Sequence, residues 1–152
     1  MTGVPRRVCP GYVTCGDCST SIAARAYQAL ERWQWQARGM DVRAELADAS
    51  TGMAPGRIAA FGCGATVPAS WPPDGALIDF DSDLLARAGA ERPGAPRVHA
   101  IGIHTPYPDE YFDRVVISSR LAGLWDQHGE LLLAEARRIG REVHVPLLHL
   151  AR

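Results

Sequence analysis

The stretch Ile58-Ala59-Ala60-Phe61-Gly62-Cys63-Gly64 decides how the rest of the chain is interpreted. Four apolar residues predict a buried strand, and the Gly-x-Gly that follows predicts a turn in which the backbone can approach a ligand. In the parallel sheets of α/β proteins, nucleotides bind at this place beyond the strand end. An ordinary tight turn has the same pattern, so the segment alone leaves both interpretations open.

Asp79 strengthens the nucleotide interpretation. It follows Gly62 by 17 positions and belongs to the next apolar run, residues 76–80. In dinucleotide-binding folds, an acidic residue about 20 positions after the glycine turn binds ribose hydroxyls. A carboxylate suits this role because it can accept hydrogen bonds from two hydroxyl groups. The alternative role for Asp79 is a helix N-cap, although Asp81 or Ser82 is better placed for it.

Short apolar runs alternate with helical patterns in the rest of the chain. The predicted strands are residues 58–61, 76–80, 98–103, 114–118 and 143–150, and the predicted helices are 20–39, 42–49, 82–90 and 130–139. The strands are apolar throughout, which is typical of strands that helices cover on both faces. We therefore expect an α/β fold with a doubly wound, mainly parallel sheet of about five strands.

The N-terminal third has a different character. Residues 1–18 are rich in Gly, Pro and Cys and predict irregular structure, and the Gly- and Pro-containing stretch 51–56 predicts a boundary. We expect an N-terminal segment with lid helices over residues 1–52 and a ligand-binding core over residues 53–152.

The composition limits the function classes. Of 152 residues, 47% are hydrophobic and 22% are charged, which is enough apolar material for a core. The net charge of -1 makes nucleic acid an unexpected partner. No signal peptide or membrane span is expected, which favours a cytoplasmic protein. All 16 basic residues are Arg, so mechanisms that need a Schiff-base or P-loop lysine are excluded.

Three of the four cysteines, Cys9, Cys15 and Cys18, lie close together, and Cys63 is in the glycine turn. They allow three interpretations. The first is a zinc or iron–sulfur site in which Cys63 is the fourth ligand. The second is a redox pair of Cys15 and Cys18 before a helix start. The third is a set of free thiols that pack over the core.

Four segments, in this order, resemble the motifs of class I S-adenosylmethionine-dependent methyltransferases. The glycine turn resembles the first motif of that family, and an acid that ends strand two before a Leu-Leu/Ala helix resembles the second. The third motif is resembled by the segment that leads into strand four, which contains a Pro-aromatic pair and a Phe-Asp pair. The fourth is resembled by the helix before strand five. The four segments are residues 61–64, 78–88, 106–116 and 135–138.

The resemblance implies a truncated, Rossmann-like methyltransferase fold that binds S-adenosylmethionine and transfers a methyl group to a small molecule. It implies that Asp79 binds the ribose and that Phe80 lies against the adenine. The residues that it implies for cofactor binding are Gly62, Cys63, Gly64, Asp79, Phe80, Gly102, Ile103, Ser118 and Ser119.

The sequence also departs from the family pattern. Ala60 stands where the family usually has an acid, Thr66 stands where a third small residue commonly closes the turn, and residues 101–105 lack an acid for the adenine amine. We expect the chain to end after the fifth strand, without the last two strands of the family. These departures favour a second hypothesis, in which a reduced methyltransferase-like domain works as a binding or assembly subunit or supports another reaction. The third hypothesis is a metal or redox protein built on the cysteines.

Two further residues are candidates for chemistry. His104 follows the third predicted strand, so it is a candidate general base, although a polar residue at the rim is the commoner role. Arg120 follows the fourth and is a candidate for holding an acidic substrate, and the alternative is a solvated or structurally paired Arg. The final strand is expected at an exposed sheet edge, which predicts a homodimer or a partner chain that covers it.

Overall fold

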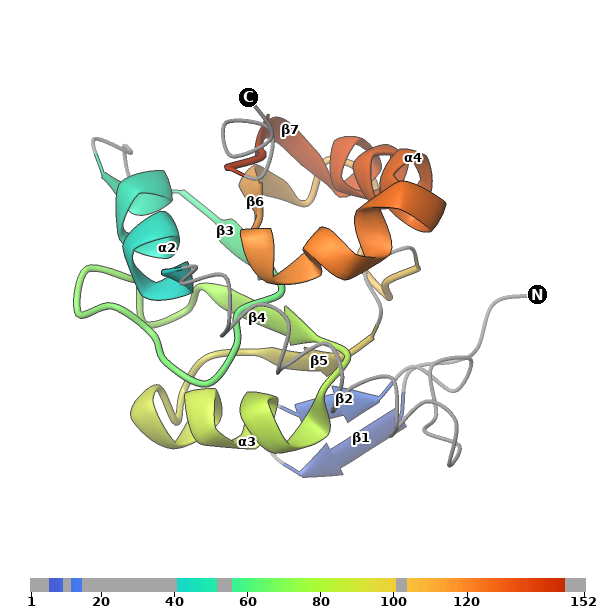
Figure 1. Ribbon diagram of the computed structural model, residues 1–152. Helices are drawn as coiled ribbons and strands as arrows, with labels where there is room; N and C mark the ends of the chain where they lie inside the picture. The colour runs from blue at the N-terminus through green and yellow to red at the C-terminus, as the bar shows by residue number, and fades with distance from the viewer. Residues whose placement is uncertain (1–5, 10–11, 15–40, 52–55, 101–103, 147–152) are drawn as a thin grey trace.

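In the computed structural model, residues 6–9, 12–14, 41–51, 56–100 and 104–146 are described, and they form one sheet with helices on both faces (Figure 1). The elements, in chain order, are β1 (Arg6–Cys9), β2 (Tyr12–Thr14), α2 (Val42–Ser50), β3 (Ile58–Phe61), β4 (Ala76–Asp79), α3 (Ser82–Glu91), β5 (Arg97–His99), β6 (Phe112–Ile117), the 3₁₀ helix η2 (Ser119–Leu121), α4 (Ala122–Ile139) and β7 (Gly140–His144).

The sheet has the strand order β1-β2-β5-β4-β3-β6-β7. Five strands, β5-β4-β3-β6-β7, pair in parallel throughout, as the sequence predicted. Counted from β3, their order is third, second, first, fourth, fifth, which is the Rossmann-like arrangement. The order reverses at β3, because the chain moves from β3 to β4 on one side and later returns to β6 on the other. This reversal creates the crevice in which such folds bind ligands.

The N-terminal segment corrects one prediction. Residues 6–9 and 12–14, expected to be irregular, form an antiparallel pair, and β2 lies parallel to β5. The sheet therefore has seven strands, which are the five predicted parallel strands and these two. The predicted helix 20–39, Cys15 and Cys18 lie outside the described residues.

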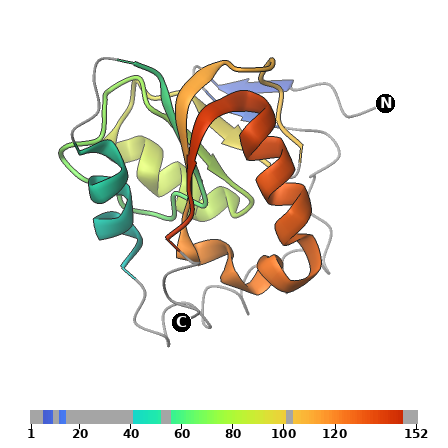
Figure 2. The same cartoon turned by 90° about the horizontal axis from the view of Figure 1, so that it is seen from above.

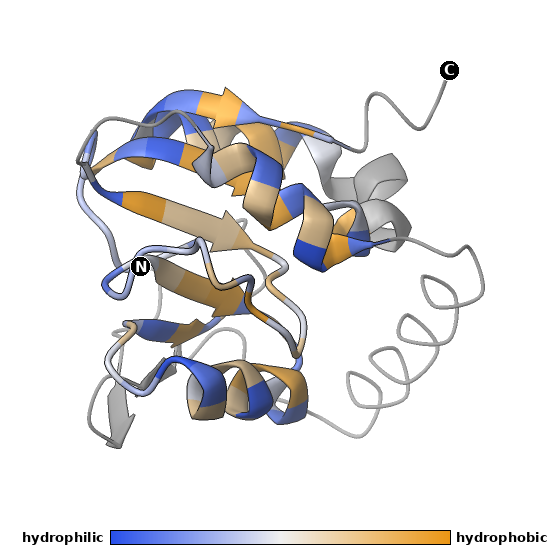
Figure 3. Ribbon diagram, turned by 90° about the vertical axis from the view of Figure 1, so that its left-hand side faces the viewer, coloured by the Kyte–Doolittle hydropathy of each residue, from blue (hydrophilic) through white to orange (hydrophobic). Residues whose placement is uncertain are grey.

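Helices cover the two faces of the sheet separately (Figure 2). On one face, residues of α2 and α3 pack against Ile58, Ala60, Leu77 and Val116. On the other face, residues of α4 pack against the alternate positions of the same strands, which include Ala59, Phe61, Ile78, Val115 and Ile117. Burial on both faces explains why residues 58–61, 76–78 and 115–117 are apolar, and the hydropathy colouring shows orange and tan in the middle strands of the sheet (Figure 3).

The observed helices match or extend the predicted ones. Asp41 caps α2 by accepting from the backbone of Ala44, and Asp81 caps α3 by accepting from Asp83 and Leu84. α4 begins at Ala122, eight residues before the predicted start at 130. Within the described residues, no helix is long and apolar enough to cross a membrane.

The last strand also starts earlier than predicted. β7 spans Gly140–His144 instead of beginning at residue 143, because the chain passes from α4 into the strand without a loop. Gly140 permits this, since a Cβ there would lie 2.5 Å from Cγ2 of Val115 on the neighbouring strand.

A partly buried polar network ties α4 to the loop before β6. The Glu135 carboxylate accepts hydrogen bonds from the backbone and hydroxyl of Thr105 and from the guanidinium of Arg138. Arg138 also donates to Asp109 and to the carbonyl of Tyr107. Burial alone would raise the pKa of Glu135, but the hydrogen bonds from Arg138 and Thr105 outweigh it and hold the pKa below its usual 4.5.

This network predicts an acid-dependent loss of stability. A carboxyl group with a lowered pKa stabilises the fold above its unfolded-state pKa, and that contribution disappears as the pH falls through the folded-state pKa. The free energy of unfolding should therefore fall from about pH 4.5 downward. We expect Glu135→Gln to be less stable than the wild type at pH 7 and to lose less stability than the wild type between pH 5 and pH 3, as measured by urea unfolding. Equal losses in the two proteins over this pH range would contradict the assignment.

Candidate functional site

The candidate site is the crevice at the carboxyl ends of β4, β3 and β6. Because β4 and β6 flank β3, the topology brings together the turn after β3, the end of β4 and η2. Gly62 and Gly64 come from the turn, Asp79 comes from β4, and Ser118 and Arg120 follow β6. These residues were singled out in the sequence, and the fold places them in one cluster.

Asp79 has no free acceptor position. Its Oδ1 accepts from the backbone of Asp81 at 2.8 Å and from Nη2 of Arg120 at 2.8 Å. Its Oδ2 accepts from the backbone of Gly64 at 3.0 Å and from Nε of Arg120 at 2.9 Å. A carboxylate offers about four acceptor positions, so these four bonds saturate it. Asp79 is 1% exposed.

Arg120 is the charged partner of Asp79. Its side chain is fully buried and forms a two-point ion pair with Asp79. Nη2 also lies 3.9 Å from Oδ2 of Asp81, and the guanidinium carbon lies 4.7 Å from the centre of the Phe80 ring. Arg120 is therefore not available to hold an acidic substrate, and it covers the ring that the resemblance would place against an adenine.

The glycine turn is packed by residues of the chain itself. Gly62 has a φ of 78°, and a Cβ there would lie 2.8 Å from Oγ of Ser118 and 2.9 Å from Cγ of Leu121. Gly64 has a φ of 68°, and the nearest atom to a Cβ there is Cδ of Arg120 at 3.7 Å. Ser118 and Leu121 thus occupy the space that a side chain at position 62 would need.

The two serines after β6 are buried and bonded within the chain. The Ser118 hydroxyl donates to the carbonyl of Gly62. The Ser119 backbone donates to Oε1 of Glu45 at 2.8 Å, and the Ser119 hydroxyl donates to Oε2. α2 is held over this part of the sheet by a second contact, in which Arg114 donates to the carbonyl of Ala49 at 2.6 Å. Sequence reasoning missed Glu45, because its partner lies 74 positions away.

Cys63 is fully buried, and its thiol donates to the carbonyl of Gly64. Burial, reinforced by the charge of Asp79, raises the pKa of the thiol well above its ordinary value. The group therefore stays protonated at neutral pH and is a poor metal ligand or nucleophile. In the part of the chain that the structure describes, no group of three His, Cys, Asp or Glu residues is arranged to hold a metal ion.

The remaining candidate residues are less informative. His104 is partly buried and comes just after residues 101–103, so Gly102 and Ile103 lie outside the described residues. Cys9 lies in β1, and Cys15 and Cys18 lie outside the described residues.

S-adenosylmethionine, which the sequence motifs imply, does not fit these residues as they stand. A ribose on Asp79 would have to displace Arg120, and an adenine against Phe80 would meet the same guanidinium. Separating a buried ion pair costs about 3–5 kcal/mol. Such a cost would weaken cofactor binding by about two to four orders of magnitude.

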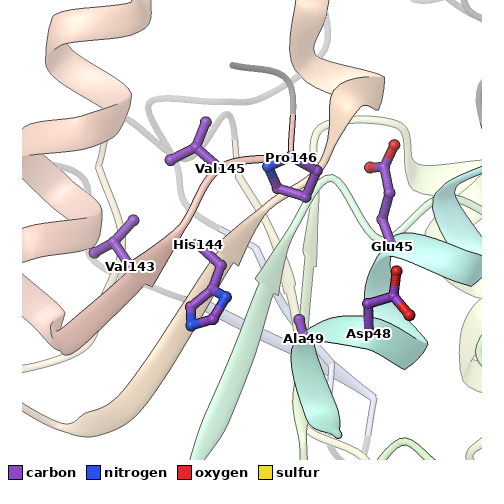
Figure 4. Close-up of a pocket in the computed structure, with 7 residues that line it drawn as sticks. All are labelled: Glu45, Asp48, Ala49, Val143, His144, Val145 and Pro146. Atoms are coloured by element: carbon purple, nitrogen blue, oxygen red, sulfur yellow. The ribbon is translucent and has the colours of Figure 1, made fainter. Parts of the chain in front are cut away.

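A separate pocket lies between α2 and the end of β7 (Figure 4). It has a volume of about 370 Å³, and Glu45 and Asp48 project from α2 while His144 projects from β7. Ala49, Val143, Val145 and Pro146 complete the lining. Its two carboxylates and imidazole, the last bonded to Glu142, are suited to hydrogen bonding with a hydroxylated or cationic ligand.

No protein-family model matches the chain. Among curated proteins, the chain is similar to two proteins named validoxylamine A glucosyltransferase, from Streptomyces hygroscopicus subsp. limoneus and subsp. jinggangensis. Each is 36% identical over 127 residues, which cover 78% of this chain but 28% and 30% of the respective glucosyltransferase. The chain thus spans less than a third of the length of these relatives.

Among solved structures, the chain is similar to a TehB-like SAM-dependent methyltransferase from Corynebacterium glutamicum. The identity is 26%, the TM-score is 0.49, and the match covers 78% of this chain and 68% of that one. A SAM-dependent methyltransferase from Thermotoga maritima, described as a possible histamine N-methyltransferase, is 18% identical with a TM-score of 0.49 and coverages of 76% and 54%.

Proposed function

We propose that this chain is a methyltransferase-like domain that works as a binding or assembly module and not as a methyl-transfer catalyst. The ion pair between Asp79 and Arg120 carries this proposal, because it fills the position on which cofactor binding would depend. Two further observations support it. Ala60 stands where the family usually has an acid, and Gly62 is packed against Ser118 and η2.

Methyl transfer to a small molecule is the competing function. It would use the retained Gly62, Gly64 and Asp79, with His104 as a base for the acceptor. It requires Asp79 to exchange Arg120 for ribose hydroxyls, which separates the buried guanidinium from the carboxylate that binds it through two hydrogen bonds. The energetic cost of this exchange is the reason to favour the module.

The similarity to the glucosyltransferases supports a role as a module that accompanies a glycosyl-transfer domain. The matching segment is less than a third of those proteins, as expected for one module of a larger transferase. In this proposal a small hydroxylated molecule binds in the pocket beside Glu45 and His144. A second copy or a partner chain covers the edge of β7, which among the described residues pairs with β6 alone.

Titration with S-adenosylmethionine and S-adenosylhomocysteine tests the proposal directly. We expect isothermal titration calorimetry to show no saturable binding up to about 1 mM of either compound, because the displaced ion pair offsets the new contacts. The melting temperature should likewise not rise with ligand. Saturable binding with a dissociation constant of about 10 µM or below would refute the module and restore the methyltransferase.

A further inference from the structure

We propose that Arg120 is the residue that excludes a nucleoside from the crevice, so that shortening its side chain opens a site for a ligand with a ribose diol. This inference rests on the proposed function, which takes the crevice to be closed. It adds the identity of the closing group and the chemical class of the ligand that it keeps out.

The guanidinium makes the same two-point contact that a diol would make. Nε and Nη2 of Arg120 donate to the two oxygens of Asp79, one bond to each, at 2.9 and 2.8 Å. Two neighbouring hydroxyl groups of a ribose also present two donors to one carboxylate. Arg120 therefore competes with a diol for the same pair of acceptor atoms.

The carboxylate is held in place independently of Arg120. The backbone of Gly64 donates to Oδ2, and the backbone of Asp81 donates to Oδ1. These two bonds come from the turn after β3 and from the start of α3, so neither involves the Arg120 side chain. Asp79 is thus positioned for a new pair of donors.

The atoms around the guanidinium also suit a nucleoside. The Phe80 ring lies 4.7 Å from the guanidinium carbon and offers an apolar face for a base. Gly64 has no side chain to obstruct the space, and a Cβ there would lie 3.7 Å from Cδ of Arg120. Removing the guanidinium therefore leaves a carboxylate, an aromatic ring and a glycine around one vacated volume.

Two variants, Arg120→Ala and Arg120→Gln, test this inference with S-adenosylhomocysteine as the probe. We expect binding by calorimetry to improve from no saturation at about 1 mM in the wild type to a dissociation constant of about 0.1 mM or below, a gain of at least tenfold. Arg120→Lys is the matched control, and because it retains a cation near Asp79, it should not gain binding. Adding Asp79→Ala to Arg120→Ala should abolish the gain.

The outcomes separate this inference from the proposed function. Binding by the wild type at about 10 µM would refute the proposed function. A wild type and folded Arg120 variants that all fail to bind would refute the role of Arg120 and leave the proposed function intact. Where circular dichroism shows that a variant is partly unfolded, about 1 mM probe should raise its ratio of folded to unfolded protein about tenfold by mass action. A ratio that does not change would also overturn the inference.

Discussion

Replacing Asp79 with alanine is expected to lower the free energy of unfolding by about 3–5 kcal/mol, because Arg120 would remain buried without its main counter-charge. The backbone groups of Gly64 and Asp81 would also lose an acceptor. A domain of this size typically has a total stability of about 5–15 kcal/mol, so the variant should lose a large share of it. Urea unfolding followed by circular dichroism measures the change.

A matched pair of variants isolates the ion pair. Arg120→Met alone should also cost about 3–5 kcal/mol, whereas the double variant Asp79→Ala/Arg120→Met should cost much less than the sum of the single effects. Additive losses in the double variant would show that the two side chains do not depend on each other. A loss below about 1 kcal/mol for Asp79→Ala would mean that the carboxylate is solvated in solution and that the crevice is open.

The parallel core could be predicted because its signals are local. Residues 58–61 and 76–79 are short apolar runs with turns after them, and the cap of α3 is an Asp before a Ser-Asp-Leu-Leu start. The α4 start was placed too late because Gly123 and Gly129 weaken the helical pattern. Packing of Leu132, Ala136 and Ile139 against the sheet outweighs that weakness.

The sequence contains a local indication of the antiparallel pair β1 and β2. Arg6–Cys9 and Tyr12–Thr14 are β-forming stretches on either side of Pro10-Gly11, a turn-forming pair. Each strand has four residues or fewer, so neither has a period that stands out. Their place in the sheet depends on β5, which is more than 80 positions away.

The sequence singles out Asp79 and Arg120 as separate candidates and does not predict that they form a pair. Asp79 and Arg120 were assigned to separate roles, one for a ribose and one for a substrate. Their contact depends on β4 and β6 being the two neighbours of β3, about 10 Å apart across the sheet. An Arg side chain that follows β6 is long enough to span most of the distance between β6 and β4. An Asp at the end of the second core strand and an Arg after the fourth are therefore a sequence pattern that could predict such an ion pair.

Gly62→Ala is the second substitution with a large expected effect, and we expect it to cost about 2–5 kcal/mol in the absence of any ligand. A φ of 78° costs a residue with a side chain about 1–2 kcal/mol. The new Cβ would also lie 2.8 Å from Oγ of Ser118 and 2.9 Å from Cγ of Leu121, and overpacking of this kind typically adds about 1–3 kcal/mol. Chemical unfolding of the ligand-free protein measures the loss.

Gly64→Ala is the matched control, because Gly64 shares the backbone conformation without the crowding. Its φ is 68°, and the nearest atoms to a Cβ there lie at 3.7 and 4.0 Å. This variant should lose only about 1–2 kcal/mol. If the turn existed to admit a ligand, both substitutions would affect ligand binding and would destabilise the free protein by similar amounts. A larger loss for Gly62→Ala would instead mean that a glycine is needed at position 62 for close packing with Ser118 and Leu121. This packing is what we expect of a closed crevice.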